Sequence, residues 1–203
     1  MLEALERSRL GVGDPLSPPA RYALLDADGD LRVRDAALNL ISYRARTRSE
    51  LQRRLQQKGF VRTRIDPCLD RLQERGFIDD AAVAAAFIRD RLRHRPRGKA
   101  RLSSELRAKG VHEDLAKQTI DRVFQDEETS DIDLACAVAE KWISRQNPTA
   151  LDGLNSDGRS PERDKAKRRL NGYLARRGFR GEALGAAIRH AFEACCGKRR
   201  ERS

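Results

Sequence analysis

The chain has 203 residues, of which 39% are hydrophobic and 36% are charged, a composition that favours small helical units with wide solvated faces over one thick core. Lysine and arginine number 42 against 31 aspartate and glutamate residues, and the formal net charge of +11 is typical of proteins that bind a polyanion or an acidic protein surface. No run approaches the ~18 apolar residues that a membrane span requires, and no long apolar stretch of a signal peptide is present near the N-terminus, so we expect a cytoplasmic protein.

The first 32 residues contain several prolines and glycines and show little hydrophobic periodicity. We therefore expect a flexible N-terminal extension, with a short extended piece at YALL. The DADGD run at 26–30 has the acidic residues of a calcium-binding loop, but counting from Asp26 puts Leu31 at the position of the sharp-turn glycine and Ala37 at the position of the bidentate glutamate. The run is therefore predicted to be a solvated turn rather than a metal site.

From Asp35 onward apolar residues recur at spacings of three and four, which predicts an all-α chain. One ten-residue pattern occurs three times: LQRRLQQKGF at 51–60, LSSELRAKGV at 102–111 and LNGYLARRGF at 170–179. The two leucines lie on one helix face, a cation lies in the last turn, and the glycine takes the left-handed conformation that ends the helix. Gly59, Gly110 and Gly178 are therefore predicted to be helix C-caps.

Other residues indicate where helices begin. Thr47 followed by Glu50 is a capping-box pattern, and Ser160 followed by Pro161 is a good pair for an N-cap and a first helical position. Pro67 would break a helix interior, so we expect its helix to begin late, with Asp66 as the N-cap and Pro67 as the first helical residue.

Each repeated helix is preceded and followed by another amphipathic segment, so the unit has three helices. The glycines of the first two copies are 51 residues apart and those of the last two are 68 apart, because a loop rich in Pro, Gly, Asn and Ser is inserted in the third unit. Three tandem three-helix repeats predict an elongated modular body, since each unit packs mainly on its neighbours. We expect an extension at 1–32, repeats at 33–76, 77–127 and 128–197 with an inserted loop at about 147–160, and a basic tail at 198–203.

The residues that carry catalysis or bind metals show no familiar arrangement. The four cysteines form no CxxC pair, so we expect reduced, core-filling or incidental thiols. The three histidines match no nucleophile or metal-ligand spacing, and phosphate-binding glycine loops are absent from the sequence. We therefore expect a protein that is not an enzyme and has no cofactor.

The positive charge is concentrated in three segments, at 44–64, 89–109 and 163–180, each with a net charge of +7, whereas residues 112–140 hold nine acids against two bases. If the repeats stack in similar orientations, these segments line one continuous basic face suited to a polyanion. The alternative is that the cations only solvate helix faces, and adjacent cations on one helix cannot all face one groove. The candidate partner- or nucleic-acid-binding residues are Arg44, Arg46, Arg48, Arg53, Arg54, Lys58, Arg91, Arg93, Arg101, Arg107 and Lys109.

Three stretches, DAALNLISYRARTRSELQRRLQQKGF, LDRLQERGFIDDAAVAAAFIRDR and GKARLSSELRAKGV, resemble the RecX family of bacterial recombination regulators, and the resemblance runs from residue 35 to about 195. It implies three tandem three-helix repeats in a curved all-α body. It also implies binding in the groove of the RecA filament on single-stranded DNA, with inhibition of RecA's ATPase, strand-exchange and coprotease activities. A protein of this family would modulate DNA repair, homologous recombination and the SOS response.

Two other functions remain open from the residues alone. The same basic segments could belong to a direct DNA-binding protein, such as a helix-turn-helix regulator, or to a hub that binds another protein. In all cases we expect a monomer, with weak direct DNA binding as a further possibility for the RecX-like protein.

Overall fold

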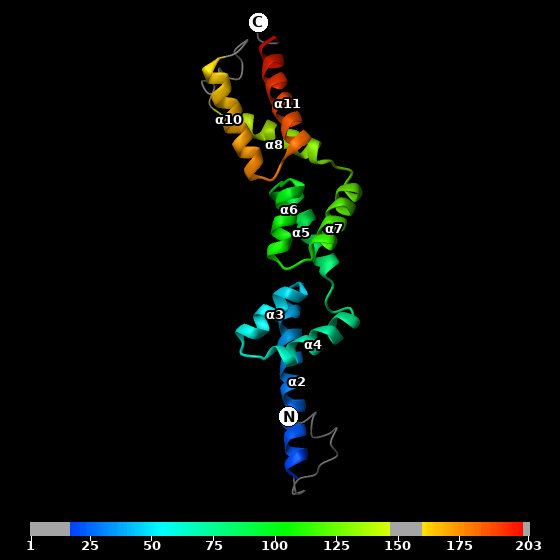
Figure 1. Cartoon of the computed structure of the whole chain (residues 1–203). Helices are drawn as coiled ribbons and strands as arrows, with labels where there is room; N and C mark the ends of the chain where they lie inside the picture. The colour runs from blue at the N-terminus through cyan, green and yellow to red at the C-terminus, as the bar shows by residue number, and fades with distance from the viewer. Residues whose placement is uncertain (1–16, 147–159, 201–203) are drawn as a thin grey trace. The chain divides into compact units, whose positions relative to one another are not determined.

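The computed structural model describes residues 17–146 and 160–200 of the chain, with side chains up to Glu193. Every helix or strand in these ranges is an α-helix, which confirms the predicted all-α class. In chain order (Figure 1), the helices are α2 (Pro18–Tyr43), α3 (Arg48–Gln57), α4 (Arg62–Glu74), α5 (Asp80–His94), α6 (Lys99–Ala108), α7 (Glu113–Asp126), α8 (Asp131–Ile143), α10 (Pro161–Arg176) and α11 (Gly181–Arg200). None of the described helices is both long and apolar enough to cross a membrane. The inserted loop, the first 16 residues, the last three residues and the side chains of Cys195 and Cys196 lie outside the described part.

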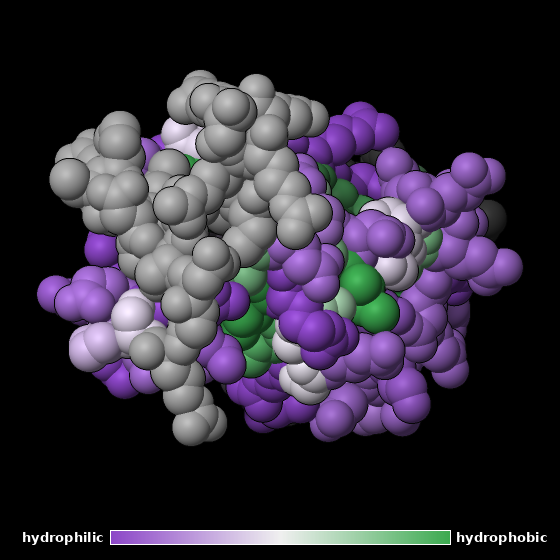
Figure 2. All heavy atoms as spheres, turned by 90° about the horizontal axis from the view of Figure 1, so that it is seen from above, coloured by the Kyte–Doolittle hydropathy of each residue, from purple (hydrophilic) through white to green (hydrophobic). Residues whose placement is uncertain are grey.

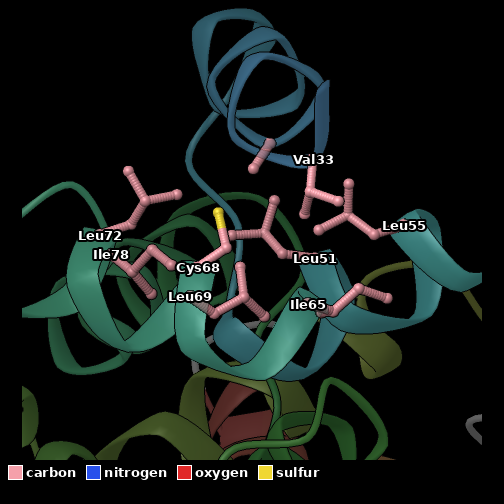
Figure 3. Packing of buried hydrophobic residues seen from close by; sticks show 9 residues of the cluster. Val33, Leu51, Leu55, Ile65, Cys68, Leu69, Leu72 and Ile78 are labelled. Atoms are coloured by element: carbon pink, nitrogen blue, oxygen red, sulfur yellow. The ribbon is translucent and has the colours of Figure 1, made fainter. Parts of the chain in front are cut away.

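The chain divides into two compact units, which meet within α5 between Val83 and Ala84. In the first unit, α2, α3 and α4 enclose one hydrophobic core. Val33 from α2 lies over Leu51 and Leu55 of α3, and the apolar residues of α4 close the core from the other side (Figure 3). Each such side chain, once fully buried, stabilises the fold by about 1.5–3 kcal/mol.

The second unit contains two further cores of the same kind. Helices α5, α6 and α7 enclose a core around Leu102 and Leu106, and α8, α10 and α11 enclose another around Leu170 and Leu174. The leucine pairs of the repeated pattern are therefore the centres of separate cores, and Leu51 and Leu55 play this part in the first unit. This confirms the three tandem three-helix repeats.

The repeated glycines cap their helices as predicted. Gly59, Gly110 and Gly178 have φ values of 88°, 79° and 91°. In each case the amide of the residue that follows the glycine donates to the carbonyl of the second leucine, as from Phe60 to Leu55 over 3.2 Å. This is the Schellman arrangement, and Gly76 at the end of α4 adopts it too, with a φ of 74°.

A second feature recurs where one repeat passes into the next. The Asp80 carboxylate, on the first residue of α5, accepts a 2.8 Å hydrogen bond from the backbone amide of Arg48, the first residue of α3. The Asp131 carboxylate, on the first residue of α8, accepts one of 3.0 Å from the amide of Lys99, the first residue of α6. The middle helix of each of these two repeats thus receives an N-terminal hydrogen bond from the helix that opens the next repeat.

The prediction for the N-terminal region was wrong for residues 18–32, which form the first half of α2. Ser17 caps this helix, so the YALL piece is helical, and the DADGD run is a helical segment rather than a turn. Contact with α4 explains the difference: the Arg64 guanidinium donates to the Asp26 carboxylate at 2.7 Å and to the Asp30 carboxylate at 3.3 Å. Gly29 leaves room for this guanidinium, because a Cβ there would lie 2.3 Å from it.

The predicted late start of the fourth helix was also wrong. Helix α4 begins at Arg62, and Pro67 lies inside it. The early start places Ile65 in the first core, where it is fully buried. The Asp66 carboxylate does not cap the helix and instead accepts from the side-chain amide of Gln52 at 3.0 Å. Burial of this isoleucine offsets much of the free-energy cost of a proline inside a helix.

The two predicted N-caps are confirmed. The Thr47 hydroxyl accepts from the Glu50 amide at 3.1 Å, and the Ser160 hydroxyl accepts from the Arg163 amide at 3.1 Å. Both residues therefore satisfy an amide that the first turn of a helix would otherwise leave without a partner.

Candidate nucleic-acid interface

In the first unit, Arg44 and Arg46 converge on one carboxylate. Arg46 Nη1 donates to Glu50 at 2.7 Å and its Nε donates to the Leu40 carbonyl at 3.0 Å, while Arg44 forms a second ion pair with Glu50. The Arg46 side chain is only 11% exposed. Partial burial acts to raise the pKa of Glu50, but the two arginines outweigh it and hold the pKa below its ordinary value of 4.5. Arg46 is thus held mainly by contacts inside its own unit.

The remaining candidates of the first unit differ in how available they are. Arg48 forms an ion pair with Asp70 at 2.8 Å. Arg53 and Arg54 on α3 and Lys58 at its C-cap are exposed, and no ion pair joins these three residues to the described part of the chain. Among the predicted candidates of the first unit, these three cations are therefore the most available to a partner. Hydrophilic residues also dominate the coloured surface of Figure 2, with hydrophobic residues visible in limited areas.

In the second unit, the loop before α6 is fixed by the end of α10. The Gly98 amide donates to the Arg177 carbonyl at 2.9 Å, and Arg177 Nη1 donates to the Pro96 carbonyl at 3.3 Å. The backbones approach so closely that a Cβ on Gly98 would lie 2.6 Å from the Gly178 carbonyl group. Only glycine fits there, and the loop is therefore held in one position against α10.

Beside this loop, an aromatic ring and a carboxylate organise several cations. The Arg91 guanidinium lies 4.3 Å and the Lys109 ammonium 4.9 Å from the centre of the Phe87 ring, within the range of cation–π attraction. The Glu105 carboxylate accepts from Arg91 at 3.1 Å and from Arg101 at 2.9 Å. Partial burial acts to raise the pKa of Glu105, but these two arginines outweigh it, so the pKa is lowered and the group is ionised near neutral pH.

These side chains line a cavity of about 330 Å³, which we call the α5–α6 cleft. The Arg97 Nε is buried in this region and has no hydrogen-bond partner among the described residues. Burial is the main cause that lowers the pKa of Arg97, and the positive charges of Arg177, Arg101 and Arg91 add to it against the opposing Glu105. The lining residues of the cleft are Phe87, Arg91, Arg95, Arg97, Glu105, Ala108 and Lys109.

The cleft contains two predicted candidates, Arg91 and Lys109, and Arg101 reaches it through Glu105. Arg95 and Arg97 were not among the predicted residues, although they lie in the run at 89–101 in which every second residue is a cation. Arg93 is exposed and does not line the cleft, and Arg107 instead pairs with Glu113 at 3.2 Å. A single basic face across all three repeats remains a prediction.

The described cysteines fill space. Cys68 is buried in the first core, and burial raises the pKa of its thiol; Cys136 is half-buried beside the third core, and burial raises its pKa as well. Within the described ranges, no three His, Cys, Asp or Glu residues are grouped as a metal site would require.

Comparison with known proteins identifies the family. The first three-helix domain of RecX matches residues 34–84, and the second matches residues 79–120. The regulatory protein RecX of Halorhodospira halophila is 34% identical over 161 residues, which cover 79% of this chain and 89% of that protein. The chain belongs to the RecX family of regulatory proteins. A RecX protein of Corynebacterium efficiens is 37% identical over 163 residues, covering 79% and 73% of the two chains.

Solved RecX structures have the same fold. A crystal structure of regulatory protein RecX superposes with a TM-score of 0.71 at 23% identity and covers 93% of this chain and 86% of its own. RecX from Lactobacillus salivarius superposes with a TM-score of 0.64 at 19% identity, covering 81% and 97%. The RecX domain at 34–84 includes every residue of the core that α2, α3 and α4 enclose except Val33.

Proposed function

We propose that this RecX-family protein binds RecA filaments on single-stranded DNA and inhibits RecA's ATPase, strand-exchange and coprotease activities. It would thereby restrain homologous recombination and the SOS response, acting in the cytoplasm as a monomer, by binding rather than by catalysis and without a cofactor. Family membership is the observation that carries the proposal, because the resemblance of the first two repeats to RecX implies RecA as the partner.

The distribution of charge supports binding to a nucleoprotein filament. Such a filament presents both acidic protein patches and phosphates, and complementary charges guide association and orientation. The exposed cations Arg53, Arg54 and Lys58 and the cations of the α5–α6 cleft suit acidic groups, whereas the acid-rich segment 112–140 suits basic ones.

The proposal is tested by measuring ATP hydrolysis by RecA on single-stranded DNA while the protein is added. Inhibition is expected at well below one copy per RecA, and unchanged hydrolysis at equimolar protein would contradict the proposal. Reversing the three charges of α3 together, as Arg53→Glu, Arg54→Glu and Lys58→Glu, should weaken filament binding. The helical circular dichroism should be retained, because these side chains are exposed. Full inhibition by this variant would show that α3 does not face the filament.

A second candidate function is direct DNA binding by a helix-turn-helix-like regulator, and the cations of the α5–α6 cleft favour it. This function predicts tight binding to bare duplex DNA, with a steep loss of affinity as salt rises and a clear sequence preference. Equal affinity for unrelated duplexes would exclude a sequence-specific regulator while leaving the RecA proposal in place.

A further inference from the structure

Arg46 and Arg97 occupy the same position in successive repeats, 51 residues apart, but their surroundings differ. Arg46 donates to the Leu40 carbonyl and to the Glu50 carboxylate. The residues that correspond to Leu40 and Glu50 in the second repeat are Arg91 and Arg101. Arg97 therefore lacks the acid that neutralises Arg46, and its buried Nε has no partner among the described residues.

The cations around Arg97 come from three elements that the fold holds together. Arg91 belongs to α5, Arg95 and Arg97 to the loop fixed against α10, and Lys109 to the C-terminal cap of α6. Two of them, Arg91 and Lys109, lie over the face of the Phe87 ring. Glu105, the one carboxylate in the lining, accepts from Arg91 and Arg101, and Arg91 also pairs with Asp90 at 2.8 Å. The excess positive charge in the cleft therefore comes from Arg95 and Arg97, which no ion pair joins to the described residues.

We propose that the α5–α6 cleft binds a phosphate group of the single-stranded nucleic-acid backbone. Guanidinium groups match phosphate oxygens with paired N–H donors, and the Arg95 and Arg97 guanidinium groups that line the cleft would form such charge-assisted bonds. The two guanidinium groups of the loop, on Arg95 and Arg97, can donate to several oxygens of one ligand, which suits a tetrahedral phosphate better than the planar carboxylate of an acidic protein segment. Because only backbone groups are contacted, this binding is independent of sequence.

The inference deepens the proposed function by assigning one contact to the DNA within the filament. It is tested on bare oligonucleotides without RecA. If the cleft does not bind phosphate, inhibition of RecA is still tested separately by the ATP-hydrolysis assay. If the protein does not inhibit RecA, the phosphate site is still tested by binding to the oligonucleotides.

The experiment measures binding of the full chain to labelled oligo-dT by fluorescence anisotropy over a range of salt concentrations. Arg97→Gln and Arg95→Gln should each weaken binding about tenfold and lower the slope of log affinity against log salt by about 0.7, the value for one phosphate contact on a single strand. Arg122→Gln is the matched control, because it removes the same charge from an exposed position on α7 outside the cleft. Equal effects of all three variants, or no effect of any, would overturn the proposal.

Thermal unfolding separates binding from folding. Arg97→Gln removes a buried donor that lacks a partner and a charge that three other arginines oppose, so it should leave the melting temperature unchanged or raised. Arg95 is exposed, so its variant should fold normally. Lost DNA binding with retained stability supports the site, whereas loss of binding only in step with loss of stability in both variants would overturn it.

Three further probes identify the ligand. An oligonucleotide with an uncharged methylphosphonate backbone should not distinguish wild type from Arg97→Gln, and a persisting tenfold difference would overturn the phosphate assignment. Polyglutamate tests an acidic protein segment as the ligand. If Arg97→Gln lowers the affinity for polyglutamate but not for oligo-dT, the phosphate assignment is overturned as well. Inorganic phosphate tests whether the cleft prefers a free anion. If phosphate saturates the cleft and wild type still binds oligo-dT more tightly than Arg97→Gln does, oligo-dT does not bind in the cleft and the nucleic-acid backbone is excluded as its ligand.

Discussion

The loops that precede α3 and α6 occupy the same position in the repeat, yet different groups hold them. In the first unit the Glu50 carboxylate forms ion pairs with both Arg44 and Arg46 of the loop. In the second unit the corresponding residue is Arg101, and the backbone around Gly98 is fixed against the end of α10 instead. A scaffold that holds a loop by backbone contacts does not need an acid to neutralise its cations, so those cations remain available to bind an anion.

The comparison also shows that a count of cations is a poor guide to a binding surface. Both loops lie in segments with a net charge of +7. The Arg46 side chain is 11% exposed and is paired with a carboxylate, whereas no ion pair joins Arg97 to the described residues and three other cations line the same cleft. What differs is whether the fold provides an acid at the right place.

The largest expected effect concerns the backbone contact that replaces Glu50. A Cβ at Gly178 would lie 2.5 Å from the Arg101 amide nitrogen, whereas a Cβ at Gly59 would meet nothing within 4 Å. Gly178→Ala should therefore lower the free energy of unfolding by about 3 kcal/mol, and Gly59→Ala by only about 1 kcal/mol from its positive φ alone. Urea unfolding followed by circular dichroism measures both, and equal losses would show that the contact with α10 does not hold the loop.

The next prediction imposes the charge pattern of the second unit on the first. Glu50→Arg leaves Arg44 and Arg46 facing a third cation, with only backbone carbonyls left as acceptors, and it should destabilise the protein by about 2 kcal/mol. Glu50→Gln keeps a hydrogen-bond acceptor and should cost about 1 kcal/mol. A Glu50→Arg variant as stable as wild type would remove the distinction between the two loops.

Glu50 also predicts how stability depends on pH. Its pKa is lower in the folded protein than its ordinary value of 4.5, so its contribution is fully present above that value and is lost as the pH falls through the folded pKa. As the pH is lowered through this acidic range, the free energy of unfolding should fall less steeply for Glu50→Gln than for wild type. Identical pH profiles would show that the arginines do not stabilise the ionised form.

The hydrogen bond from the first amide of a middle helix to an aspartate of the next helix but one occurs in both units, so its removal should lower stability equally in both. Asp80→Ala and Asp131→Ala each remove the carboxylate that accepts from the first amide of a middle helix, and each should cost about 1 kcal/mol. Asp80→Asn and Asp131→Asn keep the acceptor and should cost less. Thermal unfolding of the four variants measures this, and a clear difference between the two positions would mean that the two joints are not equivalent.

The smallest expected effect comes from giving the second unit the acid of the first. Arg101→Glu places a carboxylate beside Arg97 in the position that Glu50 has beside Arg46. The variant should change the free energy of unfolding by no more than about 0.5 kcal/mol, because the new pair with Arg97 is offset by the lost Arg101–Glu105 pair and by repulsion between the two carboxylates. It should lose affinity for oligo-dT in the anisotropy assay. Unchanged affinity in a variant of this stability would argue against the phosphate site.

Local sequence patterns predicted the repeats well, because the leucine spacing and the capping glycines depend on residues within a few positions of one another. The first half of α2 could not be predicted in this way, since its contact with α4 is made by Arg64, 34 residues beyond Asp30. Pro67 was misplaced for the same reason, because burial of Ile65 in the core outweighs a local preference.

The candidate site was predicted only in part. Arg91, Arg101 and Lys109 were selected from their basic segment, but Arg95 and Arg97 of the same segment were not. Their importance depends on the contact between Gly98 and Arg177, which are 79 positions apart, and on the absence of an acid that only alignment of the repeats reveals. Such long-range contacts leave no local pattern in the sequence.

The hydrogen bonds from Asp80 and Asp131 also give the chain an order of completion during synthesis. The first amide of α3 receives its partner only when Asp80, 32 residues later, has left the ribosome, and the same separation applies to Lys99 and Asp131. Each of these middle helices is therefore finished by a residue of the following repeat, and a nascent chain that stalls at a repeat boundary exposes an incomplete helix end. The helix ends of each of these repeats are thus completed only by the first residue of α5 or α8, in the repeat that follows.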